Sequence, residues 1–381
     1  MKQNQFFHEI HGNFGFGCMR LPMKDNEVNY DEFSKMADAF IDAGFNYFDT
    51  AHGYIDGKSE TAIRDCVAKR FDRSRFLLTN KLTDSYFKSQ EDIRPFFMSQ
   101  LSACGVSYFD FYLMHAQDRN NYKKFQSCKA YETAYKFKEE GLIRHFGISF
   151  HDKADVLDRI LSEHPEIEVV QIQFNYVDYE DASVESRKVY EVCEKHSKPV
   201  IVMEPVKGGS LVNLPKDADA ILRRLNGGSN ASYAIRFAAS FPSIAMVLSG
   251  MSDMSQMTDN LKAMKDFIPL SETEMDAVHR VCGIFRDLNL IPCTACRYCV
   301  EENECPMNIR IPDIFSTRNA YEAFHDWNAK FYYHGVVTGG EYGKASDCIK
   351  CGMCEAVCPQ HLPIRDLLEQ VAETFEKKKK E

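Results

Sequence analysis

Eight short apolar runs alternate with amphipathic segments between residues 14 and 250, and this alternation constrains the fold more than any other feature. The runs are rich in β-branched and aromatic residues and are largely non-alternating, which is typical of strands buried on both faces of a parallel sheet. Most of them start about 25–35 residues apart, the length of one strand–helix unit. They are GFGCM (15–19), FNYFD (45–49), FLLTN (76–80), FDFYLMH (109–115), HFGIS (145–149), VVQIQF (169–174), VIVME (200–204) and AMVLSG (245–250).

Eight such units in about 250 residues predict an α/β fold, a (β/α)₈ TIM barrel. The intervening segments have helical patterns, as in DEFSKMADAFIDAG (31–44), SETAIRDCVAKRF (59–71) and ASVESRKVYEVCEKH (182–196). A doubly wound open sheet is the alternative fold. It is disfavoured because no glycine-rich GxGxxG turn opens the first unit. The stretch GFGCMR has too few glycines and precedes LPM, which breaks a helix.

The repeating pattern stops after about residue 285, and eight of the 14 cysteines follow residue 292. We place a domain boundary there, with the barrel over 1–286 and a smaller domain over 287–381. Within the smaller domain, residues 312–340 look helical and aromatic, and IRDLLEQVAETFEKK (364–378) predicts a final helix. The other six cysteines occur singly, as expected of small buried hydrophobic residues. They are Cys18, Cys66, Cys104, Cys128, Cys193 and Cys282.

The charge of the chain excludes several classes of partner. Its formal net charge is −10, with acidic and basic residues interspersed, so it lacks the basic face that nucleic-acid binding needs. The one charge run, KKKKE at 377–381, reads as a solvated tail. No stretch approaches the roughly 20 apolar residues that cross a bilayer, and no secretion signal is visible, so we expect a cytoplasmic protein. In such a reducing compartment, clustered cysteines bind metals or carry redox chemistry before they form disulfides.

Polar side chains mark the ends of three successive predicted strands. Asp49, Lys81 and His115 stand at these ends, and Tyr54 follows in the loop after Asp49. In a barrel, the carboxyl ends of the strands build the active site. Carbonyl reduction needs a proton donor at the oxygen, and a phenol with a pKa near 10 needs tuning to serve. A nearby ammonium lowers that pKa, a carboxylate holds the ammonium charged, and a histidine can orient the carbonyl oxygen.

These residues resemble the aldo-keto reductase family over about residues 10–275. The resemblance rests on FDTAHGY, TNKL, YLMHA, GLIRHFGIS, VVQIQFNY and DNL, in this order and spacing. It implies Tyr54 as general acid/base, Asp49 and Lys81 as its tuning pair, and His115 as the group that positions a small carbonyl or alcohol substrate. It also implies a nicotinamide at the barrel mouth. The implied cofactor contacts are Ser149 and Gln171 to the carboxamide, with Met19, Arg20, Gly250, Ser252, Gln256 and Asn260.

Three positions depart from the family pattern. Phe150 follows Ser149 where the family often has asparagine, and Met203 stands where many relatives stack an aromatic ring on the nicotinamide. The stretch SGMSDMSQMTDN (249–260), in the region that usually grips a 2′-phosphate, has no lysine or arginine, and Asp253 would repel that phosphate. NADH is therefore favoured over NADPH.

Two cysteine clusters follow the barrel. The second, Cys348-x₂-Cys351-x₂-Cys354-x₃-Cys358-Pro, is the run associated with bacterial [4Fe–4S] ferredoxins, in which the fourth cysteine ligates the other cluster. The first has Cys293, Cys296 and Cys299 at the same spacing and then, after five residues, Cys305-Pro306. Two zinc sites are the alternative, but zinc ribbons need only paired CxxC hooks. The tail thus resembles a two-cluster ferredoxin-like α+β domain. That resemblance implies Cys293, Cys296 and Cys299 with Cys358, and Cys348, Cys351 and Cys354 with Cys305.

Together these features predict an iron–sulfur oxidoreductase that reduces a carbonyl or oxidises an alcohol, with electrons passed to or from two [4Fe–4S] clusters. Hydride transfer moves two electrons and clusters pass them singly, so a converter is needed, and a flavin on a partner protein is one solution. The partner would be a ferredoxin, flavodoxin or flavoprotein. One alternative is an ordinary NAD(P)H-dependent reductase with structural or redox-sensing clusters. Another is a non-catalytic barrel that serves as an electron-transfer or interaction module.

Overall fold

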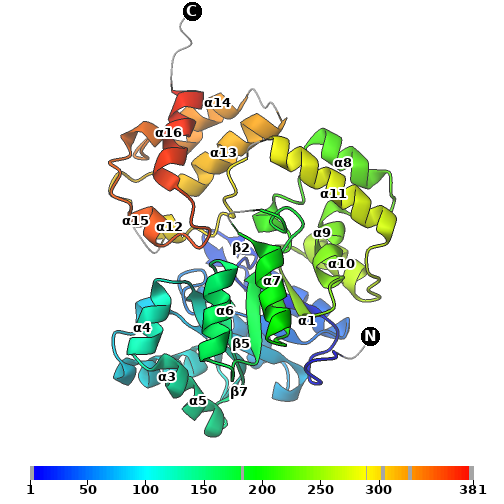
Figure 1. The fold of residues 1–381 in the computed structure, drawn as a ribbon, viewed down its shortest axis with the longest axis vertical. Coiled ribbons are helices and arrows are strands. Elements are labelled where there is room, and N and C mark those ends of the chain that lie inside the picture. The colour runs from blue at the N-terminus through cyan, green and yellow to red at the C-terminus, as the bar shows by residue number, and fades with distance from the viewer. Residues whose placement is uncertain (1–3, 182–183, 289, 302–304, 325–327, 377–381) are drawn as a thin grey trace, which may run out of the picture. The chain divides into compact units, whose positions relative to one another are not determined.

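The computed structural model describes most of the chain, and its residues divide by their contacts into two compact units (Figure 1). The first unit comprises Met1–Pro205 and Ala231–Ser271, and the second comprises Val206–Asn230 and Glu272–Glu381. Helix α11 (Glu272–Asp287), which runs across the expected boundary at residue 286, groups with the second unit. That boundary stays a prediction. The described residues are 4–181, 184–288, 290–301, 305–324 and 328–376.

The first unit is built on a closed barrel of parallel strands, so the predicted (β/α)₈ fold is confirmed. Each of the eight expected apolar runs forms one strand, and the strands pair around the barrel in the order β1-β10-β9-β8-β7-β6-β5-β4. Nearly every residue of these strands is buried, which explains their non-alternating sequences. The strands are β1 (Phe14–Gly17), β4 (Tyr47–Asp49), β5 (Leu77–Leu82), β6 (Phe109–Gln117), β7 (Ile143–Phe150), β8 (Val169–Gln173), β9 (Val200–Met203) and β10 (Ile244–Gly250).

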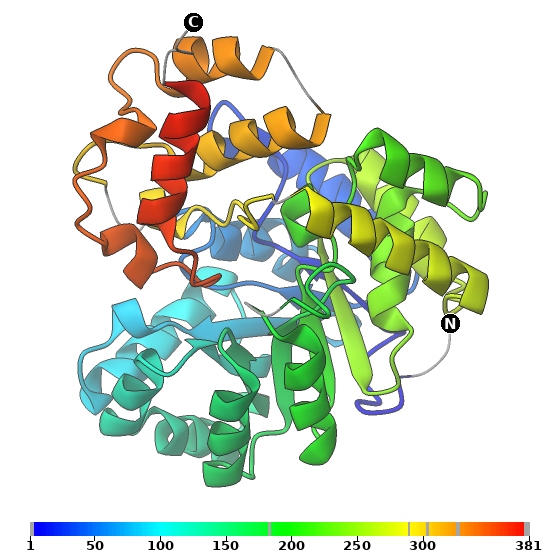
Figure 2. The ribbon, with the colours of Figure 1, turned by 45° about the horizontal axis from the view of Figure 1, so that its top comes forward.

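Helices follow most of the strands, and α4 to α7 lie outside the barrel strands in both views (Figures 1 and 2). A short antiparallel hairpin, β2 (Met23–Lys24) with β3 (Glu27–Val28), follows β1 and was not predicted. The helices of the first unit are α1 (Tyr30–Asp42), α2 (Lys58–Ile63), α3 (Gln90–Cys104), α4 (Asn121–Ser127), α5 (Ala130–Glu139), α6 (Ala154–Glu163), α7 (Ser186–Lys195), α9 (Asn230–Ala239) and α10 (Met254–Met264).

Local sequence signals account for the helix ends. Helix α1 begins after Asn29, whose side chain accepts a hydrogen bond from the backbone N–H of Glu32 at 3.2 Å. Helix α3 begins after Ser89 with a capping box that includes Asp92, and it ends at Gly105 in the left-handed conformation that glycine adopts readily. The expected helix 182–196 is α7, and residues 182–183 lie outside the described residues.

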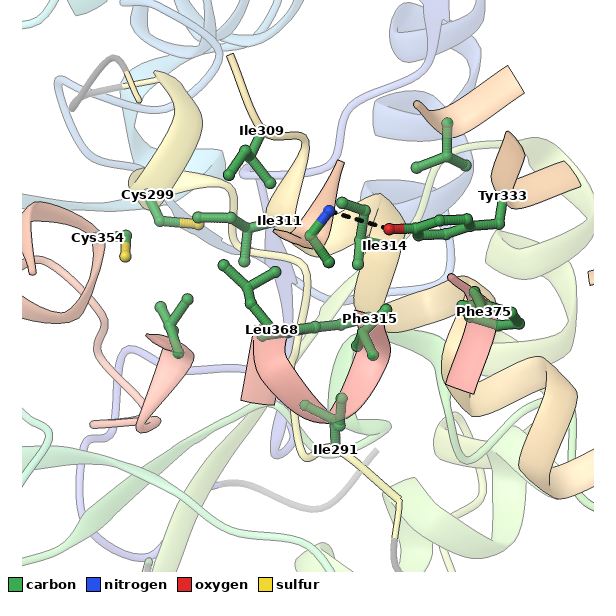
Figure 3. Close-up of a cluster of buried hydrophobic side chains, with 14 of the residues drawn as sticks. Ile291, Cys299, Ile309, Ile311, Ile314, Phe315, Tyr333, Cys354, Leu368 and Phe375 are labelled. Carbon is green, nitrogen blue, oxygen red and sulfur yellow. Dashed lines mark hydrogen bonds between the residues drawn. The ribbon is translucent and has the colours of Figure 1, made fainter. Parts of the chain in front are cut away.

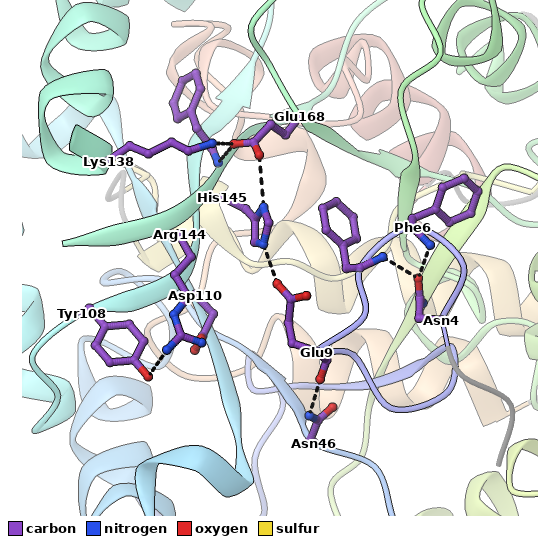
Figure 4. A network of polar contacts seen from close by, with 12 residues as sticks. Asn4, Phe6, Glu9, Asn46, Tyr108, Asp110, Lys138, Arg144, His145 and Glu168 are labelled. Atoms are coloured by element: carbon purple, nitrogen blue, oxygen red, sulfur yellow. Dashed lines mark hydrogen bonds and ion pairs between the residues drawn. The ribbon is translucent and has the colours of Figure 1, made fainter. Parts of the chain in front are cut away.

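The N-terminal segment closes the amino end of the barrel. Phe7 and Ile10 pack with residues of the barrel interior such as Phe111. The Asn4 side chain donates to the carbonyl of Ala245 at 2.6 Å, and its oxygen accepts from the backbone N–H groups of Phe6 and Phe7 (Figure 4). Since the first residues of a chain are ordered only when they are tied down, this polar anchor holds the apolar plug in place.

The regular elements among the described residues of the second unit are helices, joined by irregular segments that carry most of the cysteines, with one isolated parallel bridge between Ile309 and Gly343. The expected helical segment 312–340 forms α13, α14 and a π-helical turn, and residues 325–327 lie outside the described part, as does the lysine run at 377–381. No helix in the described ranges is long and apolar enough to cross a membrane. Besides α11 the helices are α8 (Lys216–Arg223), α12 (Tyr298–Glu301), α13 (Ile311–Phe324), α14 (Asn328–Tyr332), α15 (Met353–Ala356) and α16 (Ile364–Phe375).

An isoleucine-rich core holds the second unit together. It runs from Cys299 and Cys354 at one end to Tyr333 and Phe375 at the other (Figure 3). The phenol of Tyr333, although buried, accepts a hydrogen bond from the backbone N–H of Ala345 at 2.9 Å, so its polar atom is satisfied. Because Cys299 and Cys354 are themselves part of this core, the packing of the second unit extends to the clustered cysteines.

Candidate active site and candidate cluster sites

The structure brings the four predicted catalytic side chains together at the carboxyl end of the barrel. Asp49 is the last residue of β4, Lys81 lies in β5 and His115 in β6, three neighbouring strands. Asp49, Lys81 and His115 are each at most 7% exposed. Tyr54 lies in the loop that follows β4. Barrel topology thus turns an interval of 66 positions from Asp49 to His115 into one polar cluster.

A buried ion pair forms the base of this cluster. Lys81 Nζ donates to Asp49 Oδ1 at 2.6 Å and to the carbonyl oxygen of Thr50 at 2.9 Å. The same nitrogen lies over the Tyr54 ring, 4.8 Å from its centroid, in a cation–π arrangement. Burial raises the pKa of Asp49 and lowers that of Lys81, and the charge of each partner opposes the other's shift. Asp49 and the Thr50 carbonyl therefore hold the Lys81 ammonium in place, and the ammonium in turn lies against the ring of Tyr54.

Tyr54 differs from the sequence-based expectation in the direction of its pKa shift. Burial first, and then the negative charge of Asp49, raise the pKa of Tyr54 well above 10, while the guanidinium of Arg20 opposes them. Lys81 is not among the main causes of the shift, so the expected lowering of the Tyr54 pKa by its ammonium is not seen. Tyr54 is accordingly a protonated phenol, the form that can donate a proton.

His115 is held by a residue that the sequence analysis missed. Its Nδ1 lies 2.7 Å from Thr83 Oγ1, and its ring stands edge-on to that of Tyr54, with the centroids 6.0 Å apart. Burial, Lys81 and His151 all lower the pKa of His115 well below 6.5, so the imidazole is neutral. Thr83 and His151 are the first residues after β5 and β7. A polar residue directly after a strand was the signal that could have found them.

A buried hydrogen-bond network supports the Lys81 strand from behind. The Asn80 amide donates to Glu60 at 2.8 Å, and the Gln100 amide donates to Asn80 at 3.0 Å and to the Lys81 carbonyl at 3.0 Å. The Tyr112 hydroxyl in turn donates to Gln100 at 2.7 Å. Because these groups are buried and satisfied, they fix the position of β5 and with it the Lys81 side chain.

Two of the predicted nicotinamide contacts adjoin this cluster. Ser149 and Gln171 are paired residues of the adjacent strands β7 and β8, and both are buried. The Gln171 amide nitrogen lies 3.4 Å from Asp49 Oδ2. Its carbonyl oxygen is buried and has no hydrogen-bond partner within the described residues. Such an oxygen is positioned to accept a hydrogen bond from a bound molecule.

The other predicted cofactor contacts gather where β1 and β10 end. Arg20, which follows Met19 in the loop after β1, packs against Gly250, and its carbonyl accepts from the Ser252 hydroxyl at 3.0 Å. Gln256 accepts from the Ser252 backbone N–H at 2.9 Å. Asn260 donates to the Ser249 hydroxyl at 2.9 Å. These residues therefore meet, although their hydrogen bonds are largely with one another.

Carboxylates occupy the amino end of α10. Asp253 caps this helix by accepting from the backbone N–H of Gln256 at 2.9 Å, and this hydrogen bond lowers its pKa. Glu32 accepts a hydrogen bond from the backbone N–H of Met254, the first residue of the helix, at 3.2 Å. A helix amino end attracts anions, but here two carboxylates already fill that role.

The eight clustered cysteines line two cavities of the second unit. The first cavity is lined by Cys293, Cys296, Cys299 and Cys358. The second is lined by Cys305, Cys348, Cys351 and Cys354, and also by Cys299, which lines both cavities. The first cavity thus combines three closely spaced cysteines with one from the second run, and the second combines three with Cys299 and Cys305 from the first run.

The chemistry of these thiols fits iron–sulfur clusters. Burial is the main cause that raises the pKa of Cys299 to about 12 and that of Cys354 to about 11, so thiolates form there only with compensating positive charge. Among the described residues no three His, Cys, Asp or Glu side chains are close enough to hold one metal ion. In a [4Fe–4S] cluster each thiolate binds a different iron, so four cysteines that line one cavity are the number of ligands that such a cluster needs.

The barrel thus brings together Asp49, Lys81 and His115, all buried, with Tyr54 beside them at the carboxyl ends of its strands. The profile of the aldo/keto reductase family matches residues 13–282, and a 4Fe–4S dicluster domain matches residues 292–362. The chain therefore belongs to the aldo/keto reductase family and carries a 4Fe–4S dicluster domain after the barrel.

Individual relatives agree with this assignment. The uncharacterized oxidoreductase YqkF of Bacillus subtilis is 23% identical over 286 residues, covering 65% of this chain and 86% of that protein. Two solved structures share the fold. They are an aldo-keto reductase of Klebsiella pneumoniae in complex with NADPH (20% identity, TM-score 0.58, 71% of this chain and 90% of that one) and the holo form of an aldo-keto reductase of Bacillus halodurans (21% identity, TM-score 0.59, 74% and 95%).

Proposed function

We propose that the barrel reduces a small-molecule carbonyl, or oxidises the corresponding alcohol, with Tyr54 as the proton donor or acceptor. The observation that carries this proposal is the buried Lys81–Asp49 pair with the Tyr54 ring held against it. Reduction adds a hydride to the carbonyl carbon and a proton to the oxygen. The phenol of Tyr54 is protonated, and the positive charge of Lys81 beside its ring favours the phenolate that forms when this proton is transferred.

His115 positions the substrate in this scheme. Its Nδ1 is engaged with the Thr83 hydroxyl, so Nε2 is the ring nitrogen left for the carbonyl oxygen. Since the lowered pKa keeps the imidazole neutral, it can hydrogen-bond the oxygen without placing a second positive charge beside Lys81. Asp49 holds the Lys81 ammonium, which in turn fixes the ring of Tyr54.

The hydride donor we propose is NADH rather than NADPH. The unpaired carbonyl oxygen of Gln171 supports a nicotinamide, whose carboxamide N–H₂ could donate to it, with Ser149 on the neighbouring strand. The carboxylates of Asp253 and Glu32 at the amino end of α10 would repel a 2′-phosphate. The absence of lysine and arginine from residues 249–260 points the same way.

The two cysteine cavities would hold one [4Fe–4S] cluster each, with Cys293, Cys296, Cys299 and Cys358 as one ligand set. The second set is Cys348, Cys351, Cys354 and Cys305, and the grouping of the thiols in the two cavities supports this exchange of fourth ligands. When bound, such clusters transfer single electrons. In the direction of alcohol oxidation, NAD⁺ would take the hydride from the alcohol, and a flavin on a redox partner protein would accept the two electrons of the resulting NADH and pass them singly to the clusters. In the direction of carbonyl reduction, the same series of transfers would run in reverse to regenerate NADH.

Anaerobic assays of carbonyl reduction with NADH and NADPH test the barrel function. Replacing Tyr54 with phenylalanine should lower kcat by about 10²–10⁴-fold, because the phenol that donates the proton is lost. Tyr30→Phe, at the exposed start of α1, is the control and should leave kcat unchanged. Turnover by Tyr54→Phe at the wild-type rate would contradict the proposal. Equal or higher kcat/KM with NADPH would contradict the cofactor preference.

One observation favours a second candidate, in which the clusters are structural. A Cβ on Gly208, in the loop after β9, would lie 2.3 Å from the carbonyl oxygen of Thr294, next to Cys293. The cysteine loop therefore packs directly on a loop that follows a barrel strand. Under this candidate the clusters stay oxidised during NADH turnover, whereas absorbance bleaching by NADH or by a partner supports electron transfer.

A further inference from the structure

Gln360 is a buried amide without a hydrogen-bond partner. The residue is 7% exposed, and both Oε1 and Nε2 are shielded from solvent with no partner among the described residues. It stands two positions after Cys358 and lines the same cavity as the Cys358 thiol. A buried amide whose oxygen and nitrogen both lack a partner in the described part of the chain is costly, so its position requires an explanation.

The cavity that Gln360 lines combines sulfur and apolar groups with two other polar residues, Thr294 and Arg297. The cavity is lined by the thiols of Cys293, Cys296, Cys299 and Cys358, with Ile311, Phe315, Leu362 and Ile364 among its apolar walls. The backbone N–H of His361 donates to the carbonyl oxygen of Cys358 at 3.0 Å, which closes a tight turn around Gln360. This turn places Gln360 in the lining of the cavity together with the four cysteines.

We propose that the Nε2–H of Gln360 donates a hydrogen bond to a sulfur of the cluster held by Cys293, Cys296, Cys299 and Cys358, and thereby raises its reduction potential. Reduction adds negative charge to the cluster, so an N–H···S hydrogen bond is stronger in the reduced state. An anionic cluster only accepts hydrogen bonds, which fixes the amide with Nε2 toward it. The inference rests on the proposed clusters but not on the reaction in the barrel.

Replacement of Gln360 with methionine tests this role. Methionine matches the length of glutamine and has no N–H, so the potential of one cluster should become more negative. We expect about a tenfold change in its oxidised-to-reduced ratio at a fixed potential, equivalent to about 59 mV for a one-electron centre. The other cluster should keep its potential. The full-length protein is titrated anaerobically, and the reduced clusters are followed by electron paramagnetic resonance.

Gln370→Met is the matched control, because Gln370 is an exposed residue of α16. It should move neither potential. Unchanged potentials in Gln360→Met with full iron content would overturn the proposal, as would equal shifts of both clusters. Iron and sulfide analysis of the wild type separates the two levels of inference: about eight irons per chain is expected from two clusters, and a shortfall contradicts the clusters themselves.

If Gln360→Met loses its iron, a measurement on the wild-type protein can still test whether the Gln360 amide contacts the cluster. Gln360 and Gln370 are the only glutamines in residues 272–381. Protein labelled with ¹⁵N at the glutamine side-chain amides should show a ¹⁵N hyperfine coupling to one reduced cluster, and that coupling should persist in Gln370→Met. Absence of the coupling in the wild type would overturn the proposal.

Discussion

His145 is the residue whose charge has the clearest consequence for stability. It lies in β7 between two carboxylates, with Nδ1 facing Glu168 and Nε2 facing Glu9 of the N-terminal segment (Figure 4). Burial alone would lower the pKa of His145, but the hydrogen bonds to Glu168 and Glu9 outweigh it and raise the pKa. The protonated imidazole thus ties the N-terminal plug to the barrel.

The raised pKa of His145 predicts a pH-dependent stability. A group with a raised folded-state pKa stabilises fully below its unfolded pKa, about 6.5 for histidine, and that stability is lost as the pH rises through the folded pKa. His145→Gln should therefore cost about 1–3 kcal/mol near pH 5.5 and progressively less at higher pH. Urea unfolding followed by circular dichroism between pH 5.5 and 9 measures this difference.

The control for this prediction is His279→Gln, because His279 is exposed on α11. It should give the same small difference at every pH. A cost of His145→Gln that is constant or grows with pH would show that the imidazole does not act through its positive charge.

At the scale of elements, the loop after β9 contacts the backbone beside the first cysteine cluster. Gly208 has φ +62 and faces the Thr294 carbonyl at a distance that leaves no space for a side chain. Gly209 also has a positive φ, +98, but nothing lies within 4 Å of its Cβ position. The two glycines thus share the backbone requirement and differ in the contact with the cysteine loop.

Gly208→Ala and Gly209→Ala separate these effects. Both variants should lose about 1–2 kcal/mol from the left-handed backbone. Only Gly208→Ala should also displace Thr294 and lower the occupancy of the cluster next to it, because the obstacle is backbone and cannot rotate away. Iron content and the two electron paramagnetic resonance signals provide the measurement. Equal iron loss in both variants would contradict a specific role for the Thr294 contact.

At the scale of the whole molecule, the fourth ligands decide how the cysteine domain is tied together. Under the proposed scheme, Cys358→Ala and Cys296→Ala remove the same cluster, and Cys305→Ala and Cys351→Ala remove the other. A scheme in which each run of four keeps its own cluster predicts that Cys358→Ala instead matches Cys351→Ala. The spectra of the four variants, recorded after anaerobic reduction, distinguish the schemes directly.

Much of the fold was predictable because its signals are local. The eight apolar runs each became a strand, since burial on both faces of a parallel sheet requires uninterrupted hydrophobic sequence. The convergence of the candidate catalytic residues was predictable for a related reason: the chain places them at or just after strand ends, and strand ends converge in a barrel. The cysteine spacing indicated an iron–sulfur domain because each ligand run is short and self-contained.

Only the tertiary structure revealed the features that depend on groups far apart in the chain. The N-terminal plug, the contact of Thr83 with His115 and the orphaned amide of Gln360 involve partners or cavities that no local pattern specifies. The direction of the Tyr54 pKa shift is the sharpest case. The sequence showed which charged residues surround the phenol, but burial is the largest cause of the raised pKa and the charge of Asp49 adds to it, and burial is a property of the folded barrel alone.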